Sequence, residues 1–341
     1  MYLSLINEDI DYIKLNYKNK PFFVFLSLTN TCNANCKFCD VRTNKKLLSD
    51  INVYDLIDEL ARLGTKYIHF TGGGEPFTDK NILNYMEYAS NKGINIVFIS
   101  NGYLLDESKI ISLSKYNIKI VFLSIDSFQP FIHDSLRRTE GLYERATSSI
   151  NLLKKYIPTT KININHVLNK ENIDDFENFI NLKDKYNFDF INPILIKDCP
   201  ELTPTVTQIK RFNEKKSHYI NLMREKNIEL LSGSLNIFEE NIDEKGNRKQ
   251  NEDMRCAFAN YCAFIDCPTG LVYPCDCSIH RDRKIYCIGD LHNKSFTEIW
   301  QGDKRNELIK KLNLGTLSCK HMCDEANCLF NRNYFKGVID E

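Results

Sequence analysis

Residues 22–39 read FFVFLSLTNTCNANCKFC, an apolar run that passes directly into a cysteine-rich segment. The first eight residues are rich in Phe and Val side chains, which favour a buried strand. Cys32, Cys36 and Cys39 follow at C-x3-C-x2-C spacing. Parallel barrels place their chemistry at the carboxyl ends of strands. We therefore expect these cysteines to lie in a functional loop after the first strand of an α/β fold.

Five more strand-like segments follow this loop and alternate with helix-like segments. Six strands joined by helical connections predict a parallel sheet whose outer face is covered by helices. A closed or partly closed barrel and an open doubly wound sheet both fit this order, because periodicity does not separate them. The expected later strands are 66–70, 94–100, 118–126, 162–168 and 188–196, and the expected helices are 53–64, 81–93, 107–116, 143–156 and 174–186.

Composition narrows the functional class. The chain has 341 residues with 45 basic and 45 acidic side chains, so its net charge of zero argues against binding nucleic acid through bulk electrostatics. No apolar run reaches the roughly 20 residues of a membrane span, and no secretory signal is visible, so we expect no membrane partner and a cytoplasmic location. Disulfides rarely persist there, and 13 cysteines cannot all pair. Metal binding or catalysis explains them better.

The cysteines also divide the chain. Three lie in the first loop, Cys199 is isolated, and nine fall between Cys256 and Cys328. A long helix is expected at 205–226, followed by the polar, charged segment 236–253. The predicted domain organisation is a helical extension at 1–20, a barrel at 21–232, a linker at 233–253 and a cysteine-rich metal domain at 254–341.

Two motifs together carry a family resemblance. The C-x3-C-x2-C loop with Phe38 before its third cysteine, followed one βα unit later by TGGGEP at 71–76, resembles the radical S-adenosylmethionine (radical SAM) superfamily. The cysteine spacing alone would also fit half of a zinc site. The resemblance implies a partial (β/α)6 TIM-like barrel. It also implies a [4Fe–4S] cluster held by Cys32, Cys36 and Cys39, with one iron open to S-adenosylmethionine.

The resemblance also implies a set of cofactor-binding residues at successive strand ends. Glu75 is suited to accept hydrogen bonds from an ammonium group, and glycines let the backbone approach a ligand closely. Period-2 alternation puts Ser124 and Asp126 on one side of their strand. Arg137 is expected to face the methionine carboxylate, although a solvated helix-end charge is the alternative, and His166 is expected to be packed or at the cofactor edge. The expected set is Gly73, Gly74, Glu75, Ser100, Asn101, Ser124, Asp126 and Arg137.

The carboxyl-terminal cysteines resemble the SPASM and twitch extensions of this superfamily. Cys256, Gly270 and Cys275 match the opening C-x13-G-x4-C, with the two cysteines expected on a hairpin turned at 268–270. At least one auxiliary [4Fe–4S] cluster follows, with a zinc knuckle as the alternative. The loop cysteines depart from the full pattern, which puts a second auxiliary cluster in doubt. Candidates for the remaining ligands are Cys319, Cys323 and Cys328, then Cys262, with Cys267, Cys277 and Cys287 as spare thiols or ligands of a second cluster.

The resemblance implies reductive cleavage of S-adenosylmethionine to a 5′-deoxyadenosyl radical that abstracts hydrogen from a substrate carbon. An external electron donor such as flavodoxin or ferredoxin would be needed. The preferred substrate is a peptide, which would be modified by epimerisation, crosslinking or oxidation. The rival substrate is a sugar or an aminocyclitol. The third hypothesis is a non-catalytic iron–sulfur or zinc protein that acts as a redox sensor or scaffold. Cys199, Cys262 and Cys267 are candidate hydrogen donors, and the oligomeric state stays open.

Overall fold

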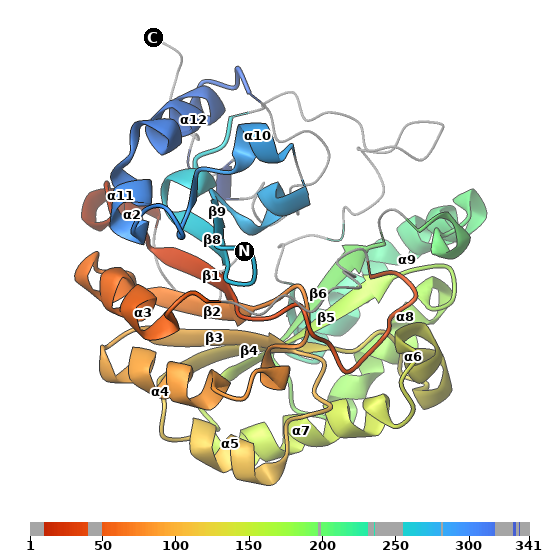
Figure 1. Ribbon diagram of the computed structural model, residues 1–341. Helices are drawn as coiled ribbons and strands as arrows, with labels where there is room; N and C mark the ends of the chain where they lie inside the picture. The colour runs from red at the N-terminus through yellow and green to blue at the C-terminus, as the bar shows by residue number, and fades with distance from the viewer. Residues whose placement is uncertain are drawn as a thin grey trace.

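A single sheet organises the molecule in the computed structural model (Figure 1), which describes residues 10–39, 50–196, 199–230, 235, 255–280, 282–317, 330, 331 and 334. Ten strands of this described part lie in the order β10-β9-β8-β1-β2-β3-β4-β5-β6-β7. The strands are β1 (Phe23–Ser27), β2 (Tyr67–Thr71), β3 (Asn95–Ser100), β4 (Ile118–Ser124), β5 (Lys161–Leu168), β6 (Phe190–Leu195), β7 (Glu229–Leu230), β8 (Cys262–Asp266), β9 (Leu271–Tyr273) and β10 (Gly289–Asp290).

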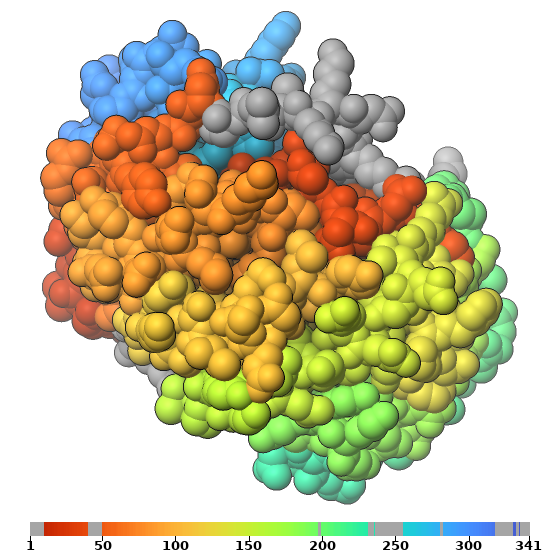
Figure 2. Space-filling view, turned by 60° about the horizontal axis from the view of Figure 1, so that its bottom comes forward, coloured from red at the N-terminus to blue at the C-terminus, as the bar shows by residue number. Residues whose placement is uncertain are grey.

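Strands β1 to β6 are parallel and neighbour one another in chain order, which confirms the expected partial (β/α)6 barrel. Helices cover the outer face, and the segments between residues 50 and 160 form most of the surface in view in Figure 2. These helices are α3 (Val53–Arg62), α4 (Ile82–Asn91), α5 (Glu107–Leu113), α6 (Pro130–Arg137), α7 (Leu142–Tyr156), α8 (Phe176–Ile180) and α9 (Val206–Glu225).

Aromatic rings fill the concave side of the sheet. The His69 ring on β2 lies 5.4 Å from the Phe25 ring on β1 and 5.4 Å from the Phe122 ring on β4. β2 and β4 are separated by β3, so these rings meet because the sheet curls around them. All three residues are buried. The barrel therefore has a closed aromatic floor, and its chemistry must lie above it at the carboxyl ends of the strands.

The carboxyl-terminal segment continues the same sheet. β8 pairs in parallel with β1, from Phe23 opposite Cys262 to Ser27 opposite Asp266. β8 and β9 form the expected antiparallel hairpin, and Gly270 adopts φ +70° in its turn, a conformation that favours glycine. The remaining helices of the described residues pack around this end: α2 (Ile10–Asn16), α10 (Arg283–Tyr286), α11 (Phe296–Gln301) and α12 (Asp303–Asn313).

Two expectations about local structure were wrong, and one helix was missed. Cys256 and Cys275 flank the hairpin strands and do not lie on them, because β8 begins at Cys262 and β9 ends at Tyr273. The segment 174–186 is not one helix: α8 lies between the 3-10 turns η2 (Ile173–Asp175) and η3 (Asn181–Asp184), and η3 buries none of its side chains. Without a buried face, packing does not hold that end in α geometry. Helix α6 was not anticipated, although Pro130 starts it at a position that suits proline.

The other 3-10 turns are η1 (Pro76–Thr78), η4 (Pro200–Leu202), η5 (Phe258–Asn260) and η6 (Asp276–His280). The expected linker at 236–253 lies outside the described residues. In the described part of the chain, we find no helix with the length and apolar character needed to cross a membrane.

Candidate functional site

The cysteine loop, residues 28–39, leaves β1 at the carboxyl edge of the sheet and is anchored on the far end of α6. The Lys37 amide donates a 2.8 Å hydrogen bond to the Leu136 carbonyl, and the Asn35 amide donates a 3.2 Å bond to the Arg137 carbonyl. Two main-chain bonds to one helix end fix the middle of the loop. Cys32 and Cys39 are exposed, and Cys36 is half-buried.

The glycine loop, residues 71–76, packs directly against the cysteine loop. The Glu75 amide donates to the Thr31 carbonyl at 2.9 Å, and the Gly73 amide donates to Ser27 Oγ at 3.2 Å. A Cβ atom added at Gly74 would lie only 2.0 Å from the Thr31 carbonyl oxygen. Backbone therefore meets backbone at this position, which only glycine permits.

Glu75 is buried and points at the end of β3. Its Oε1 accepts from Ser100 Oγ at 2.8 Å and from the Phe77 amide at 3.3 Å, and its Oε2 accepts from the Asn101 amide at 2.7 Å. Burial raises the pKa of Glu75 to about 7, although these hydrogen bonds act in the opposite direction. The carboxylate thus links the glycine loop to the end of β3 through the protein's own groups, and a bond to an ammonium group, the role expected from the sequence, stays a prediction.

Asn101 connects the third strand to the cysteine loop. Its Nδ2 donates to Asn33 Oδ1 at 2.9 Å, and its Oδ1 accepts from the Tyr103 amide at 3.0 Å. Ser124 ends β4 beside Asn165 of β5, and its hydroxyl makes no hydrogen bond with any residue that the structure describes. The carboxyl ends of three successive strands thus present polar side chains at one edge.

Arg137 is buried and paired, so the alternative of a solvated helix-end charge does not hold for it. Its Nε donates to Asp126 Oδ2 at 2.7 Å, and the guanidinium carbon lies 5.7 Å from the centre of the Phe38 ring. Burial acts to raise the pKa of Asp126, but the Arg137 charge, the two neighbouring histidines and the hydrogen bond from the Val167 amide together hold that pKa below its ordinary value.

Asp126 lies past the end of β4, whereas Ser124 is the last residue of that strand. β4 ends at Ser124, so strand alternation no longer sets the direction of the side chain two residues later. Asp126 is 0% exposed and its carboxylate is used within the protein. Asp126 thus lies beyond the end of β4, where alternation along the strand was expected to align it with Ser124.

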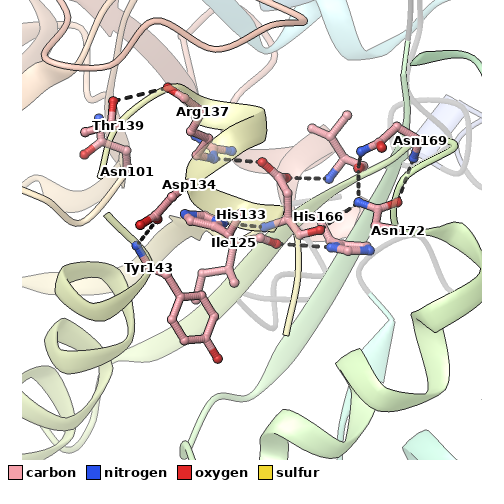
Figure 3. Close-up of polar contacts among 12 residues, drawn as sticks. Asn101, Ile125, His133, Asp134, Arg137, Thr139, Tyr143, His166, Asn169 and Asn172 are labelled. Atoms are coloured by element: carbon pink, nitrogen blue, oxygen red, sulfur yellow. Dashed lines mark hydrogen bonds and ion pairs between the residues drawn. The ribbon is translucent and has the colours of Figure 1, made fainter. Parts of the chain in front are cut away.

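Two buried histidines flank this ion pair (Figure 3). His133 Nδ1 accepts from the Asp126 amide at 3.1 Å, and His166 Nδ1 lies 3.1 Å from the Ile125 carbonyl. Burial lowers the pKa of His133 to about 3 and that of His166 to about 4. The His166 ring also stacks on Phe179 at 3.7 Å, which matches its expected packed role.

Four buried or half-buried cysteines gather beside the hairpin of β8 and β9. Burial raises the pKa of Cys256, and burial together with charges on Asp276, Cys256 and Cys277 raises that of Cys262. A hydrogen bond between the Cys275 and Cys277 side chains, together with burial, raises the pKa of Cys275. The structure therefore brings Cys262 and Cys277 to Cys256 and Cys275. The other expected ligands, Cys319, Cys323 and Cys328, lie outside the described residues.

The candidate hydrogen donors occupy three different places. Cys199 lies behind the cysteine loop, in an apolar cluster that also contains Leu136 and Phe38. Cys262 is 0% exposed and its Sγ lies 3.1 Å from the Pro274 carbonyl. Cys267 follows β8, and its amide donates to the Ser27 carbonyl at 2.9 Å, which puts it at the same edge as the cysteine loop.

The donor sets fit iron–sulfur clusters. The cysteine loop offers three thiols from one short segment, and none of the ten described cysteines forms a disulfide. Among the residues that the structure describes, no three His, Cys, Asp or Glu side chains surround a single-ion position. A multi-iron cluster is larger than one ion and accepts thiolates that lie further apart.

Sequence reasoning missed the polar side chains that hold this edge together. Asn33 ties the cysteine loop to Asn101, and Asn172 donates to the Asp126 carbonyl at 2.7 Å and to the Val167 carbonyl at 2.8 Å. The short asparagine-rich segment that follows β5 was the available signal for Asn172, because asparagine side chains commonly bond nearby main chain in turns. Nothing local indicated Asn33.

Two family profiles match the chain. The profile described as the radical SAM superfamily matches residues 26–182, which contain the cysteine loop, the glycine loop and Arg137. The SPASM profile, described as an iron–sulfur cluster-binding domain, matches residues 256–328. The two matched segments together cover more than half of the chain.

Curated relatives match about half of this chain. The AdoMet-dependent heme synthase of Methanosarcina barkeri (strain Fusaro / DSM 804) is 29% identical over 46% of this chain and 45% of its own. The PqqA peptide cyclase of Bradyrhizobium diazoefficiens is 23% identical over 55% of this chain and 52% of its own. The chain thus spans about half the length of these relatives.

Solved structures share the fold over most of the chain. Native anSMEcpe with bound AdoMet and the Kp18Cys peptide superimposes with a TM-score of 0.65 at 18% identity, covering 93% of this chain and 96% of its own. Streptococcus suis SuiB bound to precursor peptide SuiA gives a TM-score of 0.63 at 16% identity, covering 93% and 73%. A [4Fe–4S] cluster and S-adenosylmethionine are the cofactors of the first domain, and auxiliary iron–sulfur binding belongs to the second. The chain is a member of the radical SAM superfamily with a carboxyl-terminal SPASM domain.

Proposed function

We propose that this protein is a radical SAM enzyme that modifies a peptide substrate. The observation that carries the proposal is the meeting of three segments at the carboxyl edge of the sheet. The cysteine loop is bonded to the end of α6, the glycine loop presses its backbone onto Thr31, and Glu75 joins that loop to β3. This arrangement suits a cofactor that must touch a metal cluster and several strand ends at once.

Cys32, Cys36 and Cys39 would hold the cluster of this site. When bound, the cluster and S-adenosylmethionine supply radical chemistry that removes hydrogen from a substrate carbon. The protein's part is orientation: the guanidinium of Arg137 is suited to a carboxylate, because it offers a planar fork of donors. The buried rings of Phe25, His69 and Phe122 lie on the concave side of the sheet. We assign Gly73, Gly74, Glu75, Ser100, Asn101, Ser124 and Arg137 to cofactor binding.

We further propose one auxiliary [4Fe–4S] cluster at the SPASM domain, with Cys256 and Cys275 as ligands. The proximity of Cys262 and Cys277 supports them as further candidates beside Cys319, Cys323 and Cys328. Iron and sulfide analysis of anaerobically purified protein tests this. About eight irons per chain support two clusters, and about four irons with stoichiometric zinc would overturn the auxiliary cluster.

The names of one relative and of two structural neighbours support a peptide substrate. One relative is a PqqA peptide cyclase, and two structural neighbours hold peptides beside this fold. The expected outcomes are epimerisation, crosslinking or oxidation at a peptide carbon, with electrons from an external donor such as flavodoxin or ferredoxin.

The test has two stages. Reconstituted protein with reductant should convert S-adenosylmethionine to 5′-deoxyadenosine, and a Cys32→Ser variant should not. Absence of 5′-deoxyadenosine from the unaltered protein would leave only the sensor or scaffold reading. Mass spectrometry of candidate peptides incubated with the active enzyme then tests the substrate class, and a mass or retention change that requires S-adenosylmethionine supports it.

A second candidate substrate class is a tetrapyrrole. The observation that favours it is the 29% identity to an AdoMet-dependent heme synthase over 46% of this chain. Incubation with iron porphyrins under the same conditions separates the two classes. A porphyrin product with unchanged peptides would replace the peptide proposal.

A further inference from the structure

We propose that Asp126 and Asn172 are positioning residues that orient the guanidinium of Arg137 beside the cysteine loop. The inference rests on the proposed function, because it takes Arg137 as the residue that receives the carboxylate of S-adenosylmethionine. Asp126 would hold the Arg137 side chain in place, and Asn172 would hold the main chain at Asp126.

Every polar atom of Asp126 is engaged inside the protein. Its amide donates to His133 Nδ1 at 3.1 Å, and its carbonyl accepts from Asn172 Nδ2 at 2.7 Å. Its Oδ1 accepts from the Val167 amide at 2.9 Å, and its Oδ2 accepts from Arg137 Nε at 2.7 Å. Because the residue is 0% exposed, no part of it is available to a ligand. Asp126 therefore acts on the site through its neighbours.

Arg137 is held by one edge of its guanidinium. Nε is bonded to Asp126, whereas neither Nη atom has a hydrogen-bond partner among the described residues. The group lies over the Phe38 ring of the cysteine loop. With one edge fixed by Asp126, the two Nη donors form a preset fork for a carboxylate near the loop that would hold the cluster.

Asn172 fixes the main chain from which Asp126 projects (Figure 3). Its Nδ2 bridges the carbonyls of Asp126 and Val167, at 2.7 and 2.8 Å, and its Oδ1 accepts from the Asn169 amide at 2.8 Å. These bonds join the ends of β4 and β5. His133 and His166, which flank Asp126, are neutral at ordinary pH because burial lowers both pKa values. Arg137 is therefore the charged partner of Asp126.

The first experiment measures S-adenosylmethionine binding by the protein with its first cluster reconstituted. We expect the Kd of Asp126→Asn and of Asn172→Ala to rise about 10-fold, the usual scale for loss of a residue that orients a ligand-contacting group. Their electron paramagnetic resonance spectra should respond less to added S-adenosylmethionine at a fixed concentration. Asp134→Asn is the matched control, because Asp134 lies on the same helix and bonds the Gly141 and Tyr143 amides without touching Arg137.

A double-mutant cycle separates positioning from a general loss of structure. In an Arg137→Ala background, Asp126→Asn should cause no further rise in Kd, because its effect passes through Arg137. A further rise of the same size in that background, or a wild-type Kd for both single variants, would overturn the proposal. Asn172→Ala keeps the buried ion pair, so it decides the question if Asp126→Asn fails to fold. If the unaltered protein with its cluster binds no S-adenosylmethionine, the proposed function fails instead.

Discussion

Gly74 is the position at which the two loops of the site come closest. An alanine there would place its Cβ 2.0 Å from the Thr31 carbonyl oxygen and 2.5 Å from the Thr31 carbonyl carbon. Backbone cannot yield as a flexible side chain does, so Gly74→Ala should destabilise the apoprotein by about 1–3 kcal/mol. It should also lower the iron content of the first cluster. Denaturant unfolding and iron analysis of the same preparation check both effects.

Gly93→Ala provides the control for that prediction. Gly93 has φ +79° with open space around it, so alanine strains the backbone there without any collision. It should cost about 1 kcal/mol of stability and leave the iron content unchanged. Equal iron loss in both variants would mean that Gly74 acts only through stability.

Cys262 and Cys267 differ by five positions, and we expect opposite results when each is replaced. Cys262 lies beside Cys256 and Cys277, whereas Cys267 lies next to Ser27 at the other end of β8. Cys262→Ser should lower iron by about one cluster because it removes a candidate auxiliary ligand. Cys267→Ser should retain iron. Iron loss in both variants would contradict this division.

At the scale of elements, His292 joins two parts of the chain that are far apart in sequence. Its Nδ1 lies 2.6 Å from Asp290 Oδ1 in β10, and its Nε2 lies 2.9 Å from Asp50 Oδ1, just before α3. Hydrogen bonds to Asp290 and then Asp50 raise the pKa of His292 above its ordinary value of 6.5. The protonated ring thus links the SPASM segment to the barrel.

This link should depend on pH in a definite direction. Because the folded-state pKa is raised, its stabilisation is complete below pH 6.5 and is lost as pH rises through the folded-state pKa. The ring is 41% exposed, so solvent screening limits the effect to about 0.5 kcal/mol. The difference in unfolding free energy between wild type and His292→Gln should shrink as pH increases. A difference that grows with pH would contradict the assignment.

Elements with a strong local pattern were predictable, and elements held by distant contacts were not. Most of the barrel strands are apolar runs, β5 alternates apolar with polar residues, and α3 has apolar residues at helical spacing with an Asn52 cap, so local sequence was sufficient. Helix α6 is short, and it contributes to the site by binding the cysteine loop, a segment about 100 residues earlier in the chain. No periodicity reveals that the carbonyls of Leu136 and Arg137 will receive the cysteine loop.

The same limit applies to the candidate site. Cysteine spacing and the glycine motif carry their chemistry within a few residues, so they could be identified. The Asp126 cluster depends on bonds to Val167 and Asn172, which lie 41 and 46 residues away in the chain. The parallel pairing of β4 with β5 brings those strand ends together, and the local sequence does not show that pairing. Likewise, the burial of Cys262 next to Cys256 depends on how the hairpin packs.

At the scale of the whole molecule, the SPASM segment covers the edge of the barrel. β8 pairs along all of β1, whose residues are 0–2% exposed, and the Phe264 ring lies 6.5 Å from the Phe25 ring. A chain that ends at residue 253 would expose the edge of β1 and this apolar surface. We expect it to aggregate or to lose cooperative unfolding, as judged by size-exclusion chromatography and thermal denaturation. A monomeric, cooperatively unfolding barrel would show that the two parts fold independently.

Phe264→Ala tests the same contact without removing any chain. Phe264 is 5% exposed and also meets the Tyr273 ring at 6.5 Å. Its truncation should cost about 3–5 kcal/mol in a single unfolding transition. Two separate transitions would instead indicate that the sheet is not one cooperative unit.

The pairing of β1 with β8 also has a consequence for the order in which the sheet forms during synthesis. During synthesis, β1 to β6 and the cysteine loop leave the ribosome well before β8, since Phe23 and Cys262 are partners across more than 200 intervening residues. Until β8 arrives, one side of β1 has no neighbour, and such late, non-local pairing is slow. Pairing with β8 then covers that side of β1, so the carboxyl-terminal segment is the part of the chain that completes the sheet.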